Sequence, residues 1–419
     1  MAPVDIRRPF KRKAISDQQR RRELTLQRQA QSRRDAQQAA RFLACSVLSL
    51  QSHGAVDEPS DIEVESDNWK EEIESKEDEC SSLNDISVIQ ASKLKGAEGR
   101  KWFAKQLMLF EWMIDIPDRL SCDWYVFARP AGKRCFVVSS NGITISRVRN
   151  GSILHRFSSA LPNGSRSRGN FGPAHCYSIL DCIFHEQDQT YYVIDMLCWR
   201  GYSLYDCTFE FRLFWLNSKL GETGACSFPS EHHKFRFSPV IVYNCDQGGV
   251  LASYKEVTSY VKDGLVFYNK HAHYESGNTP LALVWKDGNC SHYVIDTDSK
   301  GQVPNQQLVV LELQENGNVV TSDEPPMILE CLNMEFIRES GLQPGNLLRF
   351  AVCDDGLKFV DGKLEKADLR YIGKVHRARA FADSFSKVMF QHMARSSPLK
   401  LEDILSSMSP TDEEMISSQ

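Results

Sequence analysis

Residues 124–157 decide the fold of this chain, and their sequence is WYVFARPAGKRCFVVSSNGITISRVRNGSILHRF. Runs rich in aromatic and β-branched residues make up most of it: Trp124–Arg129, Arg134–Ser139, Ile143–Val148 and Ile153–Phe157. Turn-forming residues separate these runs: Pro130-Ala131-Gly132, Asn141-Gly142 and Asn150-Gly151. The pattern predicts antiparallel strands joined by tight turns. We therefore expect an α+β or mainly antiparallel domain rather than a βαβ repeat.

The strand pattern continues toward the C-terminus. Longer strands are predicted at Tyr177–His185, Thr190–Trp199, Thr208–Trp215 and Leu281–Lys286, within a domain that spans residues 98–299. Residues 300–395 are predicted to form an additional β-rich region. Residues 396–419 are rich in Ser and acidic residues, which predicts a disordered tail.

Composition limits the classes of protein that fit this chain. With 419 residues, 42% hydrophobic and 25% charged, it can fold into two or three domains. Its 13 cysteines include no Cys-x-x-Cys pair, which argues against a zinc ribbon or a redox motif. No run of about 18 apolar residues is present. We expect a soluble intracellular protein with free thiols, no metal site, no cofactor and no membrane partner.

Charge is distributed unevenly at the N-terminal end. Residues 1–44 contain twelve Lys and Arg against four acidic residues, whereas residues 57–79 contain twelve acidic residues against two Lys. Strongly charged stretches with few aromatic residues do not bury enough apolar surface to fold alone. We therefore predict that residues 45–97 are an acidic flexible linker.

The basic segment has a helical composition. Asp17 is a suitable N-cap, and residues 17–44 are mostly Arg, Gln and Ala. A helix that is polar nearly all round needs an acidic partner. A solvated charged helix and a general nucleic-acid arm are the alternatives. The order of the arginines resembles the importin-β-binding helix of importin-α and the snurportin family: Arg20, Arg21, Arg22, Arg28, Arg33, Arg34 and Arg41. Guanidinium groups suit such a role because they pair with carboxylates in a bidentate manner.

The domain after the linker carries a more specific resemblance. The segments that carry this resemblance are Lys105–Pro117, Pro130–Arg134, Arg156–Ser159, Ile179–Cys182, Gln189–Val193, Asp195–Gly201, Tyr205–Cys207, Asp263–Tyr268, His273-Tyr274 and Thr279–Leu281. In this order they resemble the cap-binding domain of the snurportin family over about residues 100–290. The ligand of that family is the 2,2,7-trimethylguanosine cap of spliceosomal U snRNAs. The resemblance implies a fold like that of the guanylyltransferase domain of mRNA capping enzymes.

The capping enzymes attack with a lysine in a Lys-x-Asp-Gly-x-Arg block, which this chain lacks. Arg129 stands at the nucleophile position and Ala131 at the aspartate position. Arginine stays protonated, so it cannot supply the neutral amine that attacks a phosphate. Lys133 lies beyond the Pro130–Gly132 turn and is expected to point elsewhere. The sequence therefore predicts a non-enzymatic protein with no catalytic residue.

The resemblance assigns the cap contacts. Trp285 aligns with the tryptophan that stacks on the base, although one residue is inserted before it, and Trp112 aligns with the tryptophan beside the methyl groups. A methylated, positively charged guanine suits such rings through cation–π attraction. The resemblance also implies contacts from Arg134, Arg149, Phe110, Arg129 and Lys286. Each tryptophan could instead belong to the core, and Arg134 and Arg149 could be ordinary surface charges.

These observations predict a nuclear import adaptor that shuttles between nucleus and cytoplasm. Its implied partners are trimethylguanosine-capped U snRNA or snRNP and importin-β. An exportin is a further implied partner, although residues 1–15 lack the Leu-rich segment that animal members use for it. The alternatives are an RNA guanylyltransferase and a general RNA-binding protein with a basic arm. For residues 300–395, an OB-fold barrel and an extension of the preceding sheet both stay open.

Overall fold

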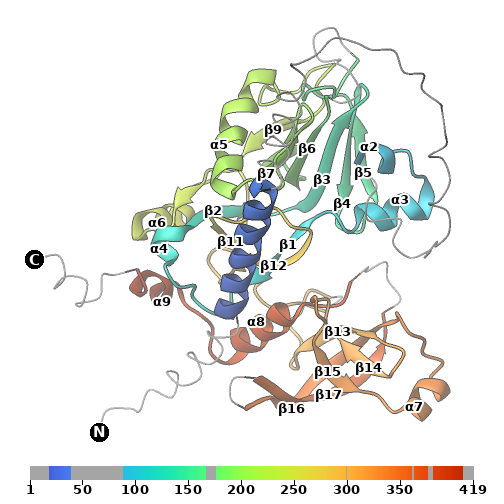
Figure 1. Ribbon diagram of the computed structural model, residues 1–419. Helices are drawn as coiled ribbons and strands as arrows, with labels where there is room; N and C mark the ends of the chain where they lie inside the picture. The colour runs from blue at the N-terminus through green and yellow to red at the C-terminus, as the bar shows by residue number, and fades with distance from the viewer. Residues whose placement is uncertain are drawn as a thin grey trace, which may run out of the picture.

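A computed structural model of the chain describes residues 18–38, 88–166, 176–298, 300–360, 363–375 and 381–408. Two β-sheets form a central domain, and a third sheet lies beyond it toward the C-terminus (Figure 1). A helix over residues 18–38 lies across the central domain. The predicted α+β fold with mainly antiparallel sheets and an N-terminal helix is confirmed. Within the described ranges, no helix has the length and apolarity needed to cross a membrane.

The first sheet of the central domain has five strands. Their order is β1 (Met108–Trp112), β12 (Gly277–Trp285), β11 (Lys262–Asn269), β2 (Trp124–Pro130) and β10 (Tyr243–Asn244). Only the β1–β12 pair in this sheet is parallel. Thus β1 brings its aromatic residues beside β12, which lies far away in the sequence.

The second sheet contains most of residues 124–157. Its strands are β5 (Ile153–Phe157), β4 (Ile143–Val148), β3 (Lys133–Ser140), β6 (Ser178–His185), β7 (Thr190–Trp199) and β8 (Tyr202–Ser203), with β9 (Arg236–Pro239) paired to β7. The predicted tight turns occur at Asn141-Gly142 and Asn150-Gly151, where Asn141 and both glycines have positive φ.

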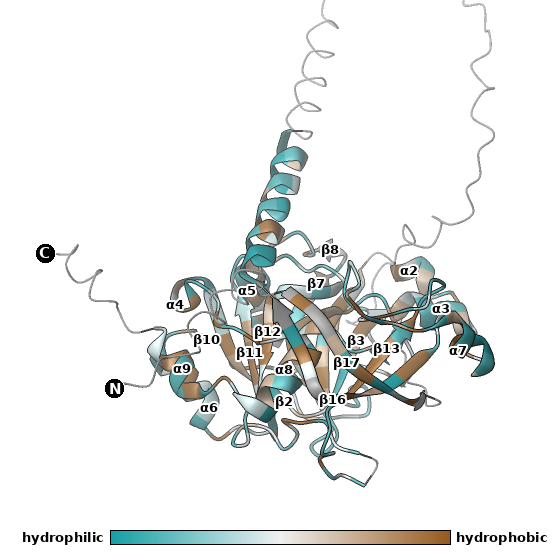
Figure 2. Cartoon of the chain, turned by 90° about the horizontal axis from the view of Figure 1, so that it is seen from below, coloured by the Kyte–Doolittle hydropathy of each residue, from teal (hydrophilic) through white to brown (hydrophobic). Residues whose placement is uncertain are grey.

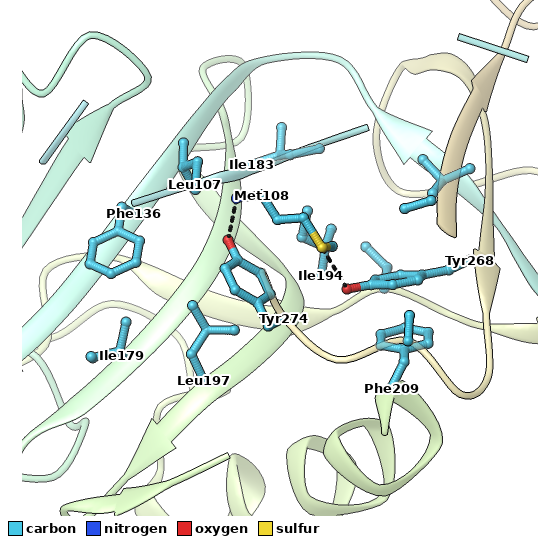
Figure 3. Packing of buried hydrophobic residues seen from close by; sticks show 14 of the residues in the cluster. Leu107, Met108, Phe136, Ile179, Ile183, Ile194, Leu197, Phe209, Tyr268 and Tyr274 are labelled. Carbon is cyan, nitrogen blue, oxygen red and sulfur yellow. Dashed lines mark hydrogen bonds between the residues drawn. The ribbon is translucent and has the colours of Figure 1, made fainter. Parts of the chain in front are cut away.

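A shared core fills the space between the two sheets (Figure 3). Ile183, Ile194 and Leu197 from the second sheet pack near Tyr268 from β11. The Tyr274 hydroxyl accepts a hydrogen bond from the backbone N–H of Met108 at 3.1 Å. Burial of these apolar surfaces holds the sheets together, at about 25 cal/mol per Å² of apolar area.

Five helices and a 3₁₀ turn in the described residues pack against the sheets of the central domain. They are α2 (Val88–Ala91), α3 (Gly96–Phe103), α4 (Leu120–Asp123), α5 (Phe209–Lys219), the 3₁₀ turn Gly221–Thr223 and α6 (Gln247–Lys255).

Two predictions about these helical segments are wrong. The linker does not extend to residue 97, because α2 begins at Val88, α3 begins at Gly96, and Ala91 is buried. The predicted strand Thr208–Trp215 is helical, because Thr208 caps α5 and the buried residues Phe209, Arg212 and Leu216 follow a helical spacing.

The C-terminal sheet is antiparallel and separate from the other two. Its order is β15 (Ile328–Cys331), β14 (Asn318–Val320), β13 (Leu308–Leu313), β16 (Leu347–Val360) and β17 (Lys363–Lys374), with α7 (Met334–Glu339) between β15 and β16. The two edge strands, β15 and β17, contact each other. Five strands with contacting edges have the form of a small, partly open barrel like that of an OB-fold.

Two C-terminal helices join this sheet to the central domain. Val388 and Met389 of α8 (Phe385–Ser396) pack into the core of the C-terminal sheet, whereas Phe390 packs into the central domain. Helix α9 (Leu401–Ser406) follows, and Ile404 is fully buried. The prediction of a disordered tail from residue 396 is therefore wrong for residues 396–408. The few apolar residues of this segment bury against the first sheet, which outweighs its polar composition.

Candidate functional site

Two cations share one carboxylate near the end of the first sheet. Arg129 on β2 and Lys286, just after β12, both form ion pairs with Asp263 on β11, and the Lys286 Nζ to Asp263 Oδ1 distance is 2.5 Å. Ser291 also donates a hydrogen bond to Asp263 at 2.7 Å. We call Arg129, Lys286 and Asp263 the cation cluster. It combines residues from β2, β11 and the end of β12, so the folded sheet creates it.

Electrostatics leaves this cluster with excess positive charge. Burial alone would raise the pKa of Asp263, but Arg129 and Lys286 outweigh burial and lower it. Burial lowers the pKa of Lys286, and Asp263 partly offsets that effect. One ionised carboxylate therefore faces two cations. Such an arrangement suits a phosphate, because an incoming anion supplies the second negative charge.

Trp112 lies beside the cation cluster at the end of β1. The Lys286 Nζ is 5.5 Å from the centroid of its ring, and the ring of Phe390 on α8 lies 4.8 Å away, centroid to centroid. The indole is only partly buried. Of the predicted cap contacts, the structure thus brings Trp112, Arg129 and Lys286 together. A planar aromatic ring next to excess positive charge can bind a nucleotide.

Phe110 and Arg134 form a separate, closed arrangement. The guanidinium carbon of Arg134 lies 3.9 Å from the Phe110 ring centroid. Arg134 donates to both oxygens of the buried Asp181, at 3.0 and 2.6 Å, and Tyr274 donates to the same carboxylate at 2.8 Å. Burial opposes the charge of Arg134, but Asp181 outweighs it and raises the pKa of Arg134. In this structure the two side chains are engaged with each other and with the core.

Arg149 is also engaged by another part of the chain. Its guanidinium carbon lies 4.5 Å from the ring centroid of Phe381, in the segment between β17 and α8. No local sequence pattern predicts this contact, because the two residues are more than two hundred positions apart. Arg149 therefore lies against Phe381 of the C-terminal segment and stays exposed.

The prediction that Trp285 stacks on a ligand disagrees with the structure. Trp285 is 0% exposed, and its indole N–H donates to the backbone oxygen of Leu399 at 3.0 Å. Alternate residues of a strand point to opposite faces, so Val284 packs in the core between the sheets while Trp285 packs in the core on the other face.

The position that the sequence resemblance assigns to the capping-enzyme nucleophile holds an arginine, Arg129. Arg129 stands there in the cation cluster, and Lys133 instead pairs with Glu186 at 2.6 Å, where both side chains are largely exposed. Among the described residues, no group of three or more His, Cys, Asp or Glu could hold a metal ion. The arrangement can bind an anion, and Arg129 cannot act as the attacking amine.

The N-terminal helix is docked on the central domain (Figure 1). Arg21 donates to both oxygens of the buried Glu111, at 2.7 and 2.9 Å. Arg22 is 2% exposed and donates to the backbone oxygen of Pro280 at 3.3 Å. Burial lowers the pKa of Arg22 to about 10, against the opposing influence of Asp115 and Glu111. The sequence pattern predicted an acidic partner, and here carboxylates of the same chain contact part of the helix.

Further contacts extend along the helix. Arg28 and Gln29 donate to the two oxygens of Glu275, at 2.8 and 2.9 Å, and Arg33 contacts the His273 Nε2 at 2.8 Å. Arg20 and Arg34 are exposed, as are all residues from 30 to 38. Figure 2 shows this hydrophilic end extending away from the sheets. Arg41 lies outside the described residues.

Residues 106–286 match the family model described as "Snurportin1, m3G cap-binding domain". Solved structures with a similar arrangement include a mycobacterial DNA ligase D complexed with ATP and MES, at 9% identity and a TM-score of 0.29 over 63% of this chain and 93% of that chain. Another is the ATP-dependent DNA ligase from bacteriophage T7 in complex with ATP, at 10% identity and a TM-score of 0.31 over 65% of this chain and 99% of that chain. From likenesses at this level we infer nothing about the chemistry of this chain.

Proposed function

Because residues 106–286 match the family model of the snurportin-1 m3G cap-binding domain, we propose that this chain binds the trimethylguanosine cap of U snRNAs and carries the snRNP into the nucleus. The family match is the observation that carries the proposal. The cation cluster supports it, since a cap has a chain of phosphates next to a methylated base. Arg129 and Lys286 would contact the phosphates, and Trp112 would contact the base.

Fluorescence quenching of the full chain by trimethylated and monomethylated cap dinucleotides tests cap binding. We expect the trimethylated cap to bind more tightly, and Trp112→Ala to weaken binding. Trp285→Ala is unsuitable as a test, because it would leave a cavity in the core. Equal, weak binding of both caps by the parent chain would contradict the proposal.

We further propose that the helix over residues 18–38 binds importin-β and that the protein shuttles between nucleus and cytoplasm. Arg20 and Arg34 are exposed and project from the docked helix, so they suit an acidic receptor. Arg21 and Arg22 are held by the central domain, so a receptor that surrounds the helix would require the helix to leave this surface. Pull-down of importin-β by the full chain and by an Arg20→Ala/Arg34→Ala variant tests this proposal. Equal capture by both chains would count against it.

The alternative function is an RNA guanylyltransferase. Arg129 at the nucleophile position argues against it, although Lys286 is a buried lysine with a lowered pKa. Incubation with labelled GTP and magnesium separates the alternatives. We expect no covalent guanylyl-protein adduct, and an adduct that Lys286→Met abolishes would establish an enzyme instead.

A further inference from the structure

Exposed basic residues gather on the short helices that precede β1. Residues 88–107 contain five Lys and Arg against a single acidic residue, Glu98. The five cations are all exposed: Lys93, Lys95, Arg100, Lys101 and Lys105. Within the described part of the chain, none of them forms an ion pair. We call these five residues the basic surface. It attracts anions, because neighbouring charges of one sign add their potentials.

Buried aromatic residues fix the direction in which the cations of α3 point. Trp102 and Phe103 are buried, and the Phe103 ring packs against Phe136 of β3, with 6.2 Å between the ring centroids. Because Trp102 and Phe103 face the core, Arg100 and Lys101 lie on the solvent-facing side of the helix. The basic surface is therefore held on an element that is anchored in the core.

The turn between β4 and β5 continues this surface. Arg147 of β4 lies 4.2 Å from the centroid of the Phe103 ring and donates a hydrogen bond to the backbone oxygen of Gly151 at 3.0 Å. Gly151 has a φ of +77°, and a Cβ there would lie 2.0 Å from the backbone oxygen of Arg100, so the turn packs directly against α3. The exposed Arg149 of this turn therefore neighbours the basic surface, and Figure 1 shows α3 beside β4 and β5.

Helix stability does not explain two of the five cations. Lys95 is the N-cap of α3 and makes no capping hydrogen bond through its side chain, and Lys93 lies two residues earlier. The N-terminus of a helix carries partial positive charge, so cations are unfavourable there, and Ser, Asp or Asn is the preferred cap. Only Arg100 and Lys101, in the last turn, have the position that the helix dipole favours. The positions of Lys93 and Lys95 therefore indicate a role outside the helix.

The basic surface leads to the proposed cap contacts. Lys105 lies three residues before β1, and β1 ends at Trp112, the proposed base contact. The five residues of β1 span about 16 Å at about 3.3 Å per residue. A stacked strand of nucleic acid covers this distance with about five nucleotides at about 3.4 Å each. The first nucleotides after a bound cap are thus long enough to reach the basic surface.

We propose that the basic surface binds the phosphate backbone of the RNA that follows the cap. The proposal rests on the proposed function and adds a second contact region to it. Lys and Arg pair with phosphate oxygens without reading the bases, so this surface accepts RNA of any sequence and makes capped RNA bind more tightly than the free cap. RNA is favoured over an acidic protein as the partner, because the ligand proposed for the adjoining site carries this backbone.

Titration of the full chain with two ligands tests the proposal: the trimethylated cap dinucleotide and a trimethyl-capped RNA of about twelve nucleotides, about 40 Å long when stacked. In about 50 mM salt we expect the parent to bind the capped RNA at least about tenfold more tightly than the dinucleotide. Lys93→Gln/Lys101→Gln should reduce this ratio by at least about fivefold and bind the dinucleotide like the parent. The control, Lys234→Gln/Lys255→Gln, removes two exposed lysines elsewhere and should keep the parent ratio.

Salt dependence gives a second readout of the same titrations. Each neutralised phosphate contributes about 0.7 to the slope of log affinity against log salt for a single strand, so the loss of two cations should reduce this slope by about 1.4. Parent affinity and slope in Lys93→Gln/Lys101→Gln would overturn the proposal and leave cap binding intact. Parent-like RNA binding with loss of polyglutamate binding would overturn it in favour of an acidic protein. A parent chain that does not bind the dinucleotide would instead refute the proposed function.

Lys95→Asp separates a ligand contact from a structural role. Aspartate is a preferred N-cap, so the thermal unfolding midpoint should stay at the parent value or rise. The affinity for capped RNA should fall by at least about fivefold, because a cation is replaced by an anion. Unchanged RNA affinity in this variant, or a fall in affinity that accompanies a lower unfolding midpoint, would remove Lys95 from the basic surface.

Discussion

Two groups of buried charges in the central domain satisfy their arginines differently. In the cation cluster, Arg129 and Lys286 share the single carboxylate of Asp263. In the second group each arginine has its own carboxylate: Arg134 pairs with Asp181, and Arg212 pairs with Asp195. Tyr274 and Tyr268 donate to these two carboxylates. We call the second group the sealed network.

The difference separates charges that can bind a ligand from charges that stabilise the fold. The sealed network is electrically balanced, and Asp181, Asp195 and Arg212 are at most 1% exposed. An anion could pair with an arginine there only by breaking an existing ion pair. The cation cluster has one cation in excess and lies beside a pocket. The sequence resemblance assigned both Arg134 and Lys286 to the cap contacts. In the structure, Arg134 belongs to the sealed network and Lys286 to the cation cluster.

The largest expected effect comes from breaking the sealed network. Arg212→Ala leaves Asp195 buried without its partner, and loss of one member of a buried ion pair costs about 3–5 kcal/mol. We expect thermal or denaturant unfolding to show this loss. Arg119→Ala, which removes the exposed pair with Asp123, is the control and should leave the unfolding midpoint unchanged. Equal midpoints for the two variants would show that the network is not structural.

The next effect concerns ligand affinity at the cation cluster. Lys286→Met keeps the length of the side chain and removes the charge that would contact a phosphate. A hydrogen bond to a charged group is worth about 1.5–3 kcal/mol, so we expect cap affinity to fall about 10- to 100-fold. Lys133→Met is the matched control, because Lys133 pairs with Glu186 at the surface. A titration in which both variants bind like the parent would exclude Lys286 from the site.

Arg134 distinguishes the two groups of charges most directly, because the family resemblance assigns it to the ligand and the structure places it in the sealed network. Arg134→Lys cannot reproduce the two hydrogen bonds to Asp181, so stability should fall by about 1–3 kcal/mol. Cap affinity should stay within about twofold of the parent value, since the ligand does not meet Arg134 in this structure. Denaturant unfolding and cap titration of the same preparation measure both quantities. A loss of affinity with unchanged stability would return Arg134 to the cap site.

A smaller effect of opposite sign is expected when the shared carboxylate is removed. Asp263→Asn leaves Arg129 and Lys286 without their anion, so a triphosphate no longer competes with Asp263. We expect cap affinity to rise by up to about tenfold while the unfolding temperature falls. Calorimetric titration and thermal melting check the two changes. Weaker binding would mean that Asp263 holds the cations in the geometry that the ligand needs.

Sequence patterns predicted the elements that depend on neighbouring residues, and they did not predict contacts between residues far apart in the chain. The strands of residues 124–157 follow from local alternation and turn residues, and these signals need no distant partner. The burial of Trp285 depends on the face of β12 from which it projects, and on Leu399, which lies more than a hundred positions away. The contacts of Phe390 with Trp112 and of Phe381 with Arg149 were not predicted, because they exist only in the folded chain.

The N-terminal helix satisfies its arginines in a third way, by contacts at the edge of the central domain. Arg21 meets Glu111 and Arg28 meets Glu275, whereas Arg33 meets the neutral ring nitrogen of His273. An arginine that donates to a histidine nitrogen requires that nitrogen to be unprotonated. This contact makes part of the docking surface sensitive to pH.

The smallest expected effect is therefore a weakening of helix docking in acid. Burial, and then Arg33, lower the pKa of His273 below its ordinary value near 6.5, so the docked state favours the neutral ring. A lowered pKa gives a contribution that is complete above about pH 6.5 and is lost as the pH falls toward the lowered value. Hydrogen-exchange protection factors of the helix amides, normalised for intrinsic exchange, should drop by less than about tenfold between pH 8 and pH 5.5. His273→Gln should remove this drop and His271→Gln should retain it, whereas a drop that persists in His273→Gln would assign the pH sensitivity to another group.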